Sequence, residues 1–416
     1  MSVDLIVNVY TETLKAVSLS GTDSDGIVVS FKLTTLPTNG NFYLDAGATT
    51  LITLQTVISA TPNVATIHYK SNPGYVGADS FQYAAVDDEG LQDPTPANGN
   101  ITVLALQLWI QSTPVANTGN LRDVIYSTYN GRWLAAGGSG AAGSVQLITA
   151  LNTGTSWANN GGSQPAAVSQ IVNRIAYFGG TPSYYLALTS GGLVYSATAA
   201  SNAQSWIARS ALSIVGQYYD VVQYYSTKNS MMCFLFVGAG GKVSNCYDDF
   251  ATNFARTSSF TAAQAIYAAN TIGTLLVVAG AGGKINTYPK ARPADSMVYT
   301  ARTSQFGTSD IYGLKLCNGA LWAVGADGKM SYSSNGTAWT AVANTSFEGT
   351  AIRSIAYGAG RYVAVGDGGK IAVSTDGVNW TQQANTFDST NLRSIAFATS
   401  KFVAVGDNGK VGYWIP

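Results

Sequence analysis

The sequence predicts an all-β protein in which a small β-sandwich precedes a larger β-propeller. Three observations lead to this prediction. The 416 residues include 45 Gly and 24 Tyr but only 11% charged residues, a composition that suits short strands joined by tight turns. A motif of apolar strand, small-residue turn and lysine recurs about every forty residues, but only after the first hundred residues. A chain of this length also exceeds one ordinary core, so two domains are expected.

Residues 1–104 form the first predicted domain. The segments SFQYAAV and ATIHYK alternate apolar and polar residues, as half-buried strands of two packed sheets do. The region also contains an Asp-x-Asp-Gly turn, a Tyr-x-Gly-x-Asp-Ser-Phe-x-Tyr strand and a closing Ile-Thr-Val. In these motifs it resembles the cadherin-like or immunoglobulin-like modules of bacterial surface proteins, and the resemblance implies a β-sandwich.

Acidic residues in this first domain raise the question of calcium binding, because some modules of the kind it resembles hold calcium between adjacent copies. The carboxylates concerned are those of Asp23, Asp25, Asp79 and Asp87. Calcium takes six or more oxygen ligands, and a single copy has no neighbour to contribute them. A hydrogen-bonded turn at residues 23–26 is the preferred interpretation, and no metal or cofactor is predicted.

Residues 105–416 form the second predicted domain, a propeller of repeated blades. The stretch VAVGDGGKI at 363–371 recurs at 403–411, 322–330, 277–285 and 235–243, and degenerate copies begin at Trp133 and Tyr185. A period near forty residues is typical of a four-stranded propeller blade. The seven copies therefore predict seven blades.

Each blade can be divided into four strands from its sequence. Apolar segments such as RSIAYG are predicted to be innermost, and a second strand of the YVAVG type follows. Turns at Asn408-Gly409, Asp327-Gly328 and Gly368-Gly369 are expected to be type I′ hairpins with positive φ at both residues. A third strand comes next, and the fourth begins at a tryptophan in SWIAR, AWTAV and NWTQQ.

The last copy ends at GYWIP and therefore lacks a fourth strand. The segment LWIQSTPVANTGNLRDVIY from Leu108 matches NWTQQANTFDSTNLRSIAF from Asn379. We therefore expect residues 107–114, with Trp109, to pair with the last copy as its outer strand. A ring closed in this way has no free sheet edge.

Two short motifs in the repeat have both a structural and a functional interpretation. GDGGK lacks the spacing, the following Ser or Thr and the helix of a phosphate-binding loop, so its lysine is expected to be structural. STDGVNW resembles the Asp-box of sialidases and related bacterial and phage β-propellers at Ser374, Asp376, Gly377 and Trp380. The resemblance implies a turn between the third and fourth strands with its tryptophan packed between blades. A looser copy comprises Ser334, Asn335, Gly336 and Trp339.

An enzymatic role has weaker support from the sequence. Four arginines begin inner strands and either ring one mouth of the channel, as the sialidase arginine cluster binds a carboxylate, or pair locally; they are Arg122, Arg174, Arg353 and Arg393. Glycoside hydrolysis needs two placed carboxylates, for which Asp123, Asp220 and Asp310 are loosely arranged candidates. The single histidine, His68, lies outside the propeller. No catalytic, cofactor-binding or metal-ligating residue is predicted, and the protein is not expected to be an enzyme.

The charge balance and the hydropathy of the sequence argue against a nucleic acid partner and against membrane insertion. The 22 basic and 22 acidic residues balance, so no nucleic acid partner is expected. No apolar run reaches the ~20 residues of a membrane span, and the first residues lack the pattern of a secretory signal.

Cys233, Cys246 and Cys317 are expected to be buried free thiols, because the first two are placed diagonally across their hairpin.

These observations favour a non-enzymatic virion protein of a bacteriophage, located in capsid decoration, tail or fibre. Its first domain would anchor it to other virion proteins, and its propeller would face a host glycan or protein; homo-oligomerisation stays open. The alternative is an adhesin or glycan-binding lectin outside the cell or on the bacterial surface. A glycoside hydrolase of sialidase-like fold comes third. Residues 229–233 and 183–185 are candidate contact loops, although burial is the commoner fate of Met and Tyr.

Overall fold

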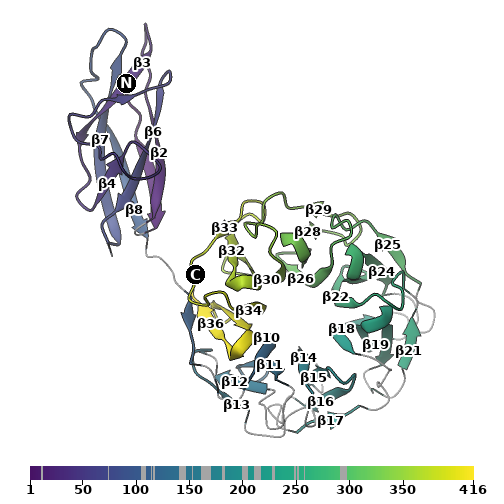
Figure 1. The fold of residues 1–416 in the computed structure, drawn as a ribbon. Helices are drawn as coiled ribbons and strands as arrows, with labels where there is room; N and C mark the ends of the chain where they lie inside the picture. Colours follow the sequence, from purple (N-terminus) through teal and green to yellow (C-terminus); the bar gives the residue numbers. More distant parts are fainter. Residues whose placement is uncertain are drawn as a thin grey trace. The chain divides into compact units, whose positions relative to one another are not determined.

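A computed structural model divides the chain into two compact units, Met1–Gln107 and Leu108–Pro416 (Figure 1). It describes the whole chain except residues 11–12, 74, 105–108, 114, 116–117, 140–146, 152, 161–169, 180–182, 199–204, 210–216, 227–229, 248–249, 251–252, 257 and 291–297. The boundary expected between residues 104 and 105 adjoins a segment outside the described residues.

The first unit consists of two β-sheets. The larger has the strand order β1 (Leu5–Tyr10), β8 (Ala97–Leu104), β7 (Gly77–Asp87), β3 (Val28–Thr35), β5 (Ile58–Ser59). The smaller has the order β2 (Leu14–Ser20), β6 (Val64–Ser71), β4 (Gly40–Tyr43). Strand β1 runs parallel to β8, and the other paired strands of this unit are antiparallel.

The core of the first unit contains side chains from both sheets. Every second residue of β8 is buried, which is the alternation of a strand with one face on the core. Leu19 and Ile67 of the smaller sheet join Phe31 and Phe81 of the larger one in a single apolar cluster. The predicted alternation is confirmed in ATIHYK and in the first half of SFQYAAV, whereas Ala84, Ala85 and Val86 are all buried; His68 lies half-buried on β6.

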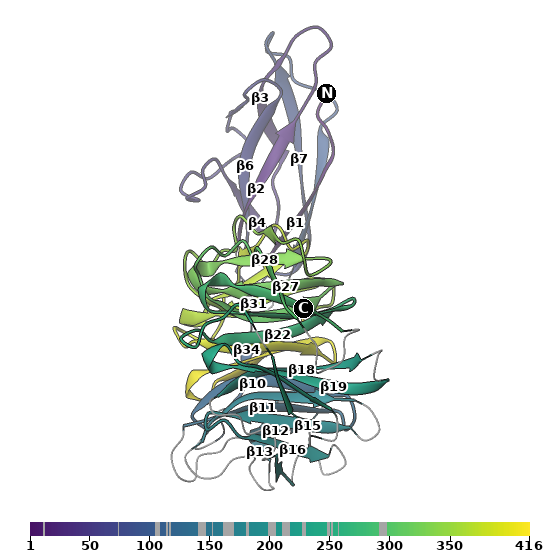
Figure 2. The same cartoon turned by 90° about the vertical axis from the view of Figure 1, so that its right-hand side faces the viewer.

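The second unit contains seven four-stranded antiparallel sheets within the residues that the structure describes. Figure 1 shows them arranged around a ring, and Figure 2 shows the same sheets from the side. The first three are β10 (Asn120–Ser127), β11 (Arg132–Gly138), β12 (Leu147–Leu151), β13 (Trp157–Asn159); β14 (Val172–Phe178), β15 (Tyr184–Thr189), β16 (Val194–Thr198), β17 (Ile207–Ala208); and β18 (Tyr218–Ser226), β19 (Met231–Gly238), β20 (Val243–Tyr247), β21 (Asn253–Arg256).

The remaining four sheets follow in chain order. They are β22 (Ile266–Ile272), β23 (Leu275–Gly280), β24 (Ile285–Pro289), β25 (Thr300–Arg302); β26 (Ile311–Cys317), β27 (Ala320–Gly325), β28 (Met330–Ser333), β29 (Thr340–Ala341); β30 (Ile352–Gly358), β31 (Arg361–Gly366), β32 (Ile371–Ser374), β33 (Thr381–Gln382); and β34 (Leu392–Ala398), β35 (Lys401–Gly406), β36 (Val411–Trp414), β9 (Ile110–Gln111). The first strand of each sheet is innermost and lies beside the first strand of the next, and β34 returns to β10.

Short turns join the second and third strands in five sheets: η3 (Ala239–Gly241), η4 (Ala281–Gly283), η5 (Ala326–Gly328), η6 (Asp367–Gly369) and η7 (Asp407–Gly409). The last two residues of each turn have positive φ, as at Gly368 (66°) and Gly369 (70°). The amide of Lys370 donates to the carbonyl of Asp367 across this turn. The predicted type I′ geometry is confirmed.

The last sheet takes its outer strand from the start of the second unit. In β9, Ile110 pairs with Tyr413 and Gln111 with Gly412 of β36. Trp109 is only 1% exposed and packs against Phe387 and Trp414, with ring centroids 5.8 and 6.2 Å away. The prediction that the segment around Trp109 completes the last sheet is confirmed.

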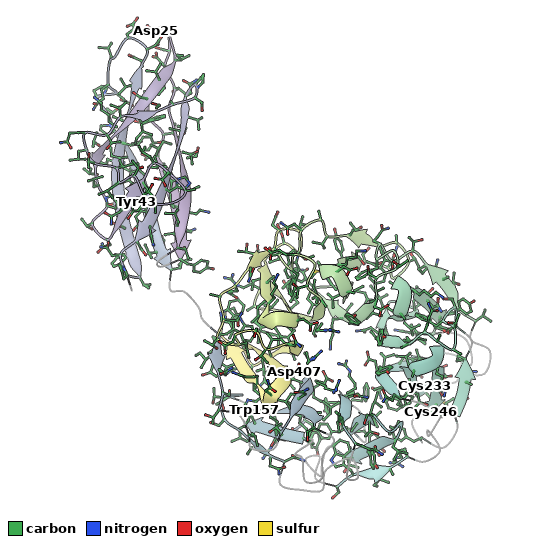
Figure 3. The ribbon with its side chains drawn as sticks, in the orientation of Figure 1. Asp25, Tyr43, Trp157, Cys233, Cys246 and Asp407 are labelled. Carbon is green, nitrogen blue, oxygen red and sulfur yellow. The ribbon has the colours of Figure 1, made fainter. Side chains whose placement is uncertain are left out.

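The three cysteines are buried and are not joined in disulfide bonds, as the sequence predicts. In the register of β19 and β20, Cys233 lies opposite Tyr247 and Cys246 lies opposite Phe234, so the two sulfurs belong to neighbouring rather than facing positions (Figure 3). Among the described residues, none of the helical segments is long and apolar enough to cross a membrane.

Candidate functional site

A β-bulge near the start of every inner strand creates a ring of seven side chains. In each case one residue of the inner strand is skipped in the pairing with the second strand. A bulged residue has no partner across the ladder, so its side chain is re-aimed. The seven residues are Arg122, Asn173, Tyr219, Tyr267, Tyr312, Arg353 and Arg393, and together they line a cavity of about 200 Å³. We call this set the bulge ring.

Tyrosines occupy one arc of the bulge ring. The ring centroids of Tyr219 and Tyr267 are 5.5 Å apart, and those of Tyr267 and Tyr312 are 5.6 Å apart. The Arg353 guanidinium lies 4.3 Å from the centroid of Tyr312, a cation–π contact. Desolvation, followed by the charge of Asp310, raises the pKa of Tyr267, so this hydroxyl stays a hydrogen-bond donor at neutral pH.

Arginines occupy the other arc. The Arg353 guanidinium donates through Nε and Nη2 to Asp367, at 2.8 and 2.5 Å. Arg393 donates in the same way to Asp407, at 2.9 and 2.6 Å, and Figure 3 shows Asp407 on the inner side of the ring of sheets. Such two-point pairs hold a guanidinium in a fixed orientation. Three arginines at the channel mouth thus face the three tyrosines.

Below the bulge ring, a buried ionic cluster links the inner strands. Arg174 donates from Nη1 to Asp123 at 3.0 Å and from Nε to Asp220 at 2.8 Å. The two carboxylates are 1% and 4% exposed. Desolvation opposes the charge of Arg174, but both carboxylates outweigh it and raise the pKa of this guanidinium. These residues and Lys315 line a second cavity of about 120 Å³ that continues the first.

The carboxylates of this cluster are fully engaged by protein donors. Asp123 also accepts hydrogen bonds from the amide of Ile175 and the hydroxyl of Ser394. Asp220 also accepts from its neighbour's amide and from the amide of Ala269. The third sequence candidate, Asp310, accepts from the amide of Gly282 at 2.8 Å. These contacts show that the three carboxylates connect separate segments of the chain to one another.

The arginines predicted from the sequence divide into two groups. Arg122, Arg353 and Arg393 belong to the bulge ring, and the latter two also pair locally with aspartates, so the predicted position at the mouth and the predicted local pairing occur together. The placement of Arg174 at an equivalent position is wrong, because Asn173 is the bulged residue of its strand. Arg174 therefore lies one step deeper, at the position of Asp123.

The tyrosines and Asn173 were missed in the sequence analysis. Their signal is the second letter of the triplets LRD, VNR, YYD, IYA, IYG, IRS and LRS that open the seven inner strands. In a regular strand without a bulge, the residue at that position would be one of the alternating residues of the strand. Only the pairing register shows that it leaves the sheet.

The lysine of the repeated turn has a structural partner. The Nζ atoms of Lys284, Lys329 and Lys370 donate to the carbonyls of Ser259, Phe306 and Phe347, at 2.7, 2.9 and 2.9 Å. Each bond fastens the loop that leads into the inner strand of the lysine's own sheet. The lysines are thus used as the sequence analysis expects.

The Asp-box-like turn holds its shape through local hydrogen bonds. The Asp376 carboxylate accepts from the amides of Val378 and Asn379, both at 2.8 Å. The indole of Trp380 donates to the carbonyl of Gly377 and packs with Trp322 of the preceding sheet. The predicted packing between sheets is confirmed.

The looser copy of this turn needs one correction. Ser333, and not Ser334, accepts the amide of Gly336 at 2.8 Å, which is the role of Ser374 toward Gly377. When Gly336 is aligned with Gly377, the serine three residues earlier is Ser333 in one turn and Ser374 in the other.

Acids of the first unit also have local partners. The buried Asp79 carboxylate accepts from the amides of Thr38 and Asn39 and from the hydroxyl of Tyr69. Asp87 caps the turn that follows it, and Asp23 accepts the amide of Ser24. Within the described residues, no three His, Cys, Asp or Glu side chains gather as a metal site.

The two candidate contact loops are partly buried. Cys233 is fully buried, while Met231 and Met232 are half-buried on β19. Tyr185 is buried and donates to Ser127 at 2.7 Å. Asn229 lies outside the described residues. Ser230 is exposed, and Ser183 and Tyr184 are half-buried, so the two segments combine core residues with accessible ones.

Comparison with known proteins places the second unit among β-propellers. YCF48 from Cyanidioschyzon merolae superposes with a TM-score of 0.55 and 14% identity over 74% of this chain and 99% of that one. A structure titled YCF48 bound to D1 peptide gives 0.53 and 14% over 74% and 95%. The WD40 propeller domain of Doa1 gives 0.55 and 10% over 74% and 96%.

Sequence comparison finds a likeness over part of the chain. Integrin beta-like protein E of Dictyostelium discoideum is 27% identical over 194 residues, which cover 43% of this chain and 10% of that protein. This chain thus matches about a tenth of that relative's length. No protein-family model matches the chain.

Proposed function

We propose that this chain is a non-enzymatic recognition protein that binds its partner at the bulge ring. The observation that carries the proposal is the difference between the two layers of the channel. The carboxylates of the deeper layer are occupied by strand-to-strand hydrogen bonds, whereas the upper layer presents arginines and tyrosines to a cavity. Donors and aromatic faces around a cavity serve binding, whereas glycoside hydrolysis needs two carboxyl groups that can exchange protons.

A glycan is the partner that this mouth suits best. All seven bulge-ring side chains carry hydrogen-bonding groups, and three of them are tyrosines whose flat faces can stack on a sugar ring. The partial likeness to an integrin beta-like protein is compatible with adhesion. The structure titled YCF48 bound to D1 peptide is a propeller with a peptide ligand, so a protein ligand is the alternative outcome.

We also infer the number of blades, the class of the turn at residues 374–380 and the class of the first unit. The seven sheets are the blades of one closed seven-bladed propeller, and the turn at residues 374–380 is an Asp-box. The first unit is an immunoglobulin-like or cadherin-like module that anchors the chain. Support comes from the pairing of β9 with β36, the hydrogen bonds of Asp376 and the two packed sheets of the first unit.

The location of the protein follows from the same proposal. On a bacteriophage particle the first unit would attach to capsid or tail proteins, and on a bacterial surface it would attach to the cell. Quantitative mass spectrometry of purified particles, cell envelopes and culture supernatant separates these locations.

Binding to a glycan array tests the function itself. The variant Tyr219→Ala/Tyr267→Ala/Tyr312→Ala is expected to reduce array binding at least ~10-fold, since each stacked aromatic contributes about 0.5–1.5 kcal/mol. The control is Val378→Ala, an exposed residue on the Asp-box turn, distant in sequence from the bulge ring.

Three outcomes would contradict the proposal. They are unchanged binding by the triple variant, binding by wild type to peptides alone, and release of a sugar product that is lost in Asp123→Asn. The last outcome would establish the glycosidase. Thermal unfolding of each variant verifies that the ring of sheets is intact.

A further inference from the structure

One lysine interrupts a layer of the inner strands that otherwise carries no charge. The layer is formed by the residue three positions after each bulge residue, which in every sheet lies opposite an apolar residue of the second strand. Its members are Ile125, Ala176, Val222, Asn270, Lys315, Ala356 and Ala396. The side-chain amide of Asn270 donates to the carbonyl of Leu314 at 3.1 Å, so this polar member is bonded within the ring of sheets. Lys315 is therefore the exception.

The Lys315 amine has no partner of its own. It lines the cavity of about 120 Å³ together with Arg174, Asp123 and Asp220, but Arg174 pairs with both carboxylates, at 3.0 and 2.8 Å. Lys315 makes no hydrogen bond and no ion pair with the part of the chain that the structure describes. Unlike the lysines of the repeated turn, it does not fasten one segment to another.

Two hydrogen-bond donors at the same cavity also lack partners within the described residues. They are the hydroxyl of Ser354, a residue only 4% exposed, and the side-chain amide nitrogen of Asn173. Ser394 holds the place of Ser354 in the next sheet and donates to Asp123, whereas Ser354 has no acid to donate to. Buried donors without partners are rare in folded proteins, so these two groups suit a ligand that accepts hydrogen bonds.

The charges at the bottom of the cavity are balanced. Two cations, Arg174 and Lys315, face two carboxylates, so a charged ligand would add an uncompensated charge at a buried place. A neutral carbonyl compound avoids this cost, because its oxygen accepts hydrogen bonds and its carbon can be attacked by an amine. Ala268 and Gly313 line the same cavity, and neither extends beyond a Cβ, which leaves room for a small molecule.

The surroundings of Lys315 favour the unprotonated amine that such an attack requires. The positive charge of Arg174, followed by desolvation, lowers the pKa of Lys315. The carboxylates of Asp123 and Asp220 and the thiol of Cys317 act in the opposite direction but are outweighed. A lower pKa gives a larger fraction of nucleophilic amine at neutral pH.

We propose that Lys315 binds a small neutral aldehyde covalently, as an imine. The nitrogen attacks the carbonyl carbon, and the C=N bond forms as the carbonyl oxygen leaves. Of the three ammonium hydrogens, two leave with that oxygen as water and one stays on the imine nitrogen, so the positive charge beside the carboxylates is unchanged. Ser354 and Asn173 donate to the carbonyl oxygen while the nitrogen attacks. This inference goes beyond glycan recognition at the bulge ring and does not depend on it.

Reductive trapping on the full chain tests the inference. The protein is incubated at neutral pH with propanal and sodium cyanoborohydride, which reduces the imine to a stable N-propyl amine, and peptide mass spectrometry locates the labelled lysines. Lys315 is expected to be labelled at least ~10-fold faster than Lys290. Lys290 is the matched control, because desolvation lowers its pKa as well, but its amine donates to the carbonyl of Gly273 and does not line the cavity. In urea, the two lysines are expected to react alike.

Two variants separate the site from general amine reactivity. Lys315→Arg keeps the positive charge and is expected to abolish the fast label. Ser354→Ala is expected to slow the labelling of Lys315 about 3-fold or more, because one hydrogen bond to the carbonyl oxygen is lost. Equal unfolding midpoints verify that both variants are folded.

The outcomes also separate this inference from the proposed function. Equal labelling of Lys315 and Lys290 in the folded chain overturns the imine site, and so does an unchanged labelling rate of Lys315 in Ser354→Ala. Fast labelling of Lys315 in a protein that binds no glycan on the array supports the imine site while the glycan proposal fails.

Discussion

Arg174 shows how one side chain can hold several strands together. Its guanidinium lies between Asp123 of β10 and Asp220 of β18, and these acids accept amides from β14 and β22. Asp123 also accepts the hydroxyl of Ser394 in the last sheet. One cation and two acids therefore connect five of the seven inner strands.

Removing that cation leaves two buried carboxylates without a counterion. Arg174→Met is expected to lower the free energy of unfolding by about 3–5 kcal/mol, the usual cost of breaking a buried pair from one side. Urea denaturation monitored by tryptophan fluorescence measures it. The comparison variant Arg302→Met removes a guanidinium that bonds a neutral hydroxyl and is expected to cost about 1 kcal/mol. A similar small loss in Arg174→Met would show that the cluster does not stabilise the ring.

Asp376 gives a prediction about pH. The amides of Asn379 and Val378 hold the pKa of its carboxyl well below its ordinary value of 3.8. Because the folded pKa is depressed, the contribution of the carboxylate to stability is present above the ordinary value and is lost as the pH falls through the folded pKa. The amide resonances of Val378 and Asn379 are therefore expected to stay unchanged from about pH 7 down to about pH 4.

The matched variant for this titration is Asp376→Asn. Asn335 already makes the equivalent bonds with its side-chain oxygen, at 2.9 and 3.1 Å. The two amides are expected to keep their shifts in the variant and to lose all pH dependence. A wild-type midpoint near the ordinary carboxyl pKa would show that the turn does not stabilise the charge.

At the scale of the strand and turn, the repeat made most of the propeller predictable. Five turns carry a residue that tolerates positive φ followed by glycine, so their geometry follows from the sequence alone. The bulges were not predictable, because Arg122, Asn173 and Tyr219 occupy an ordinary alternating position in the letters. A bulge depends on the pairing partner, and one extra residue shifts every side chain after it. The error at Arg174 has this cause.

The two glycines of η6 are expected to differ in their tolerance of substitution. Both have positive φ, but a Cβ at Gly368 meets nothing within 4 Å, whereas a Cβ at Gly369 would lie 2.1 Å from the carbonyl oxygen of Asp388. Gly368→Asn is expected to change stability by less than about 0.5 kcal/mol, since Asn408 holds that position in η7. Gly369→Asn is expected to cost about 1–3 kcal/mol.

Thermal unfolding of the two single variants checks the difference. Both variants replace a glycine of positive φ with asparagine, so the conformational cost of asparagine in this backbone region is the same in the two. The difference between them therefore reports the space around the new Cβ. Equal midpoints would mean that the loop containing Asp388 moves aside at no cost. Gly409 of η7 is a contrasting position, because a Cβ there would meet its nearest neighbour, Thr118, only at 3.4 Å.

At the scale of the whole unit, the ring is closed by strand pairing and by side chains from both ends. β9 pairs with β36, the amide of Asn408 donates to the Asn120 side chain, and Ser394 donates to Asp123. The first of these contacts was predictable because LWIQ repeats the pattern of NWTQQ. The others were not, since they join single polar residues of the first and last sheets.

Trp109→Ala is expected to weaken the ring closure in particular. Trp109, Trp339 and Trp380 are buried to similar extents, so each alanine variant is expected to lose about 3–5 kcal/mol of stability. The chain at Trp380 continues directly from its own sheet. Trp109 instead immediately precedes β9, a short strand held to β36 by only a few backbone bonds. Hydrogen exchange at the amides of β36 is therefore expected to accelerate in Trp109→Ala and to stay unchanged in Trp380→Ala. Equal exchange of β36 in the two variants would mean that β9 stays docked without its tryptophan, and that ring closure depends on the polar contacts between the first and last sheets.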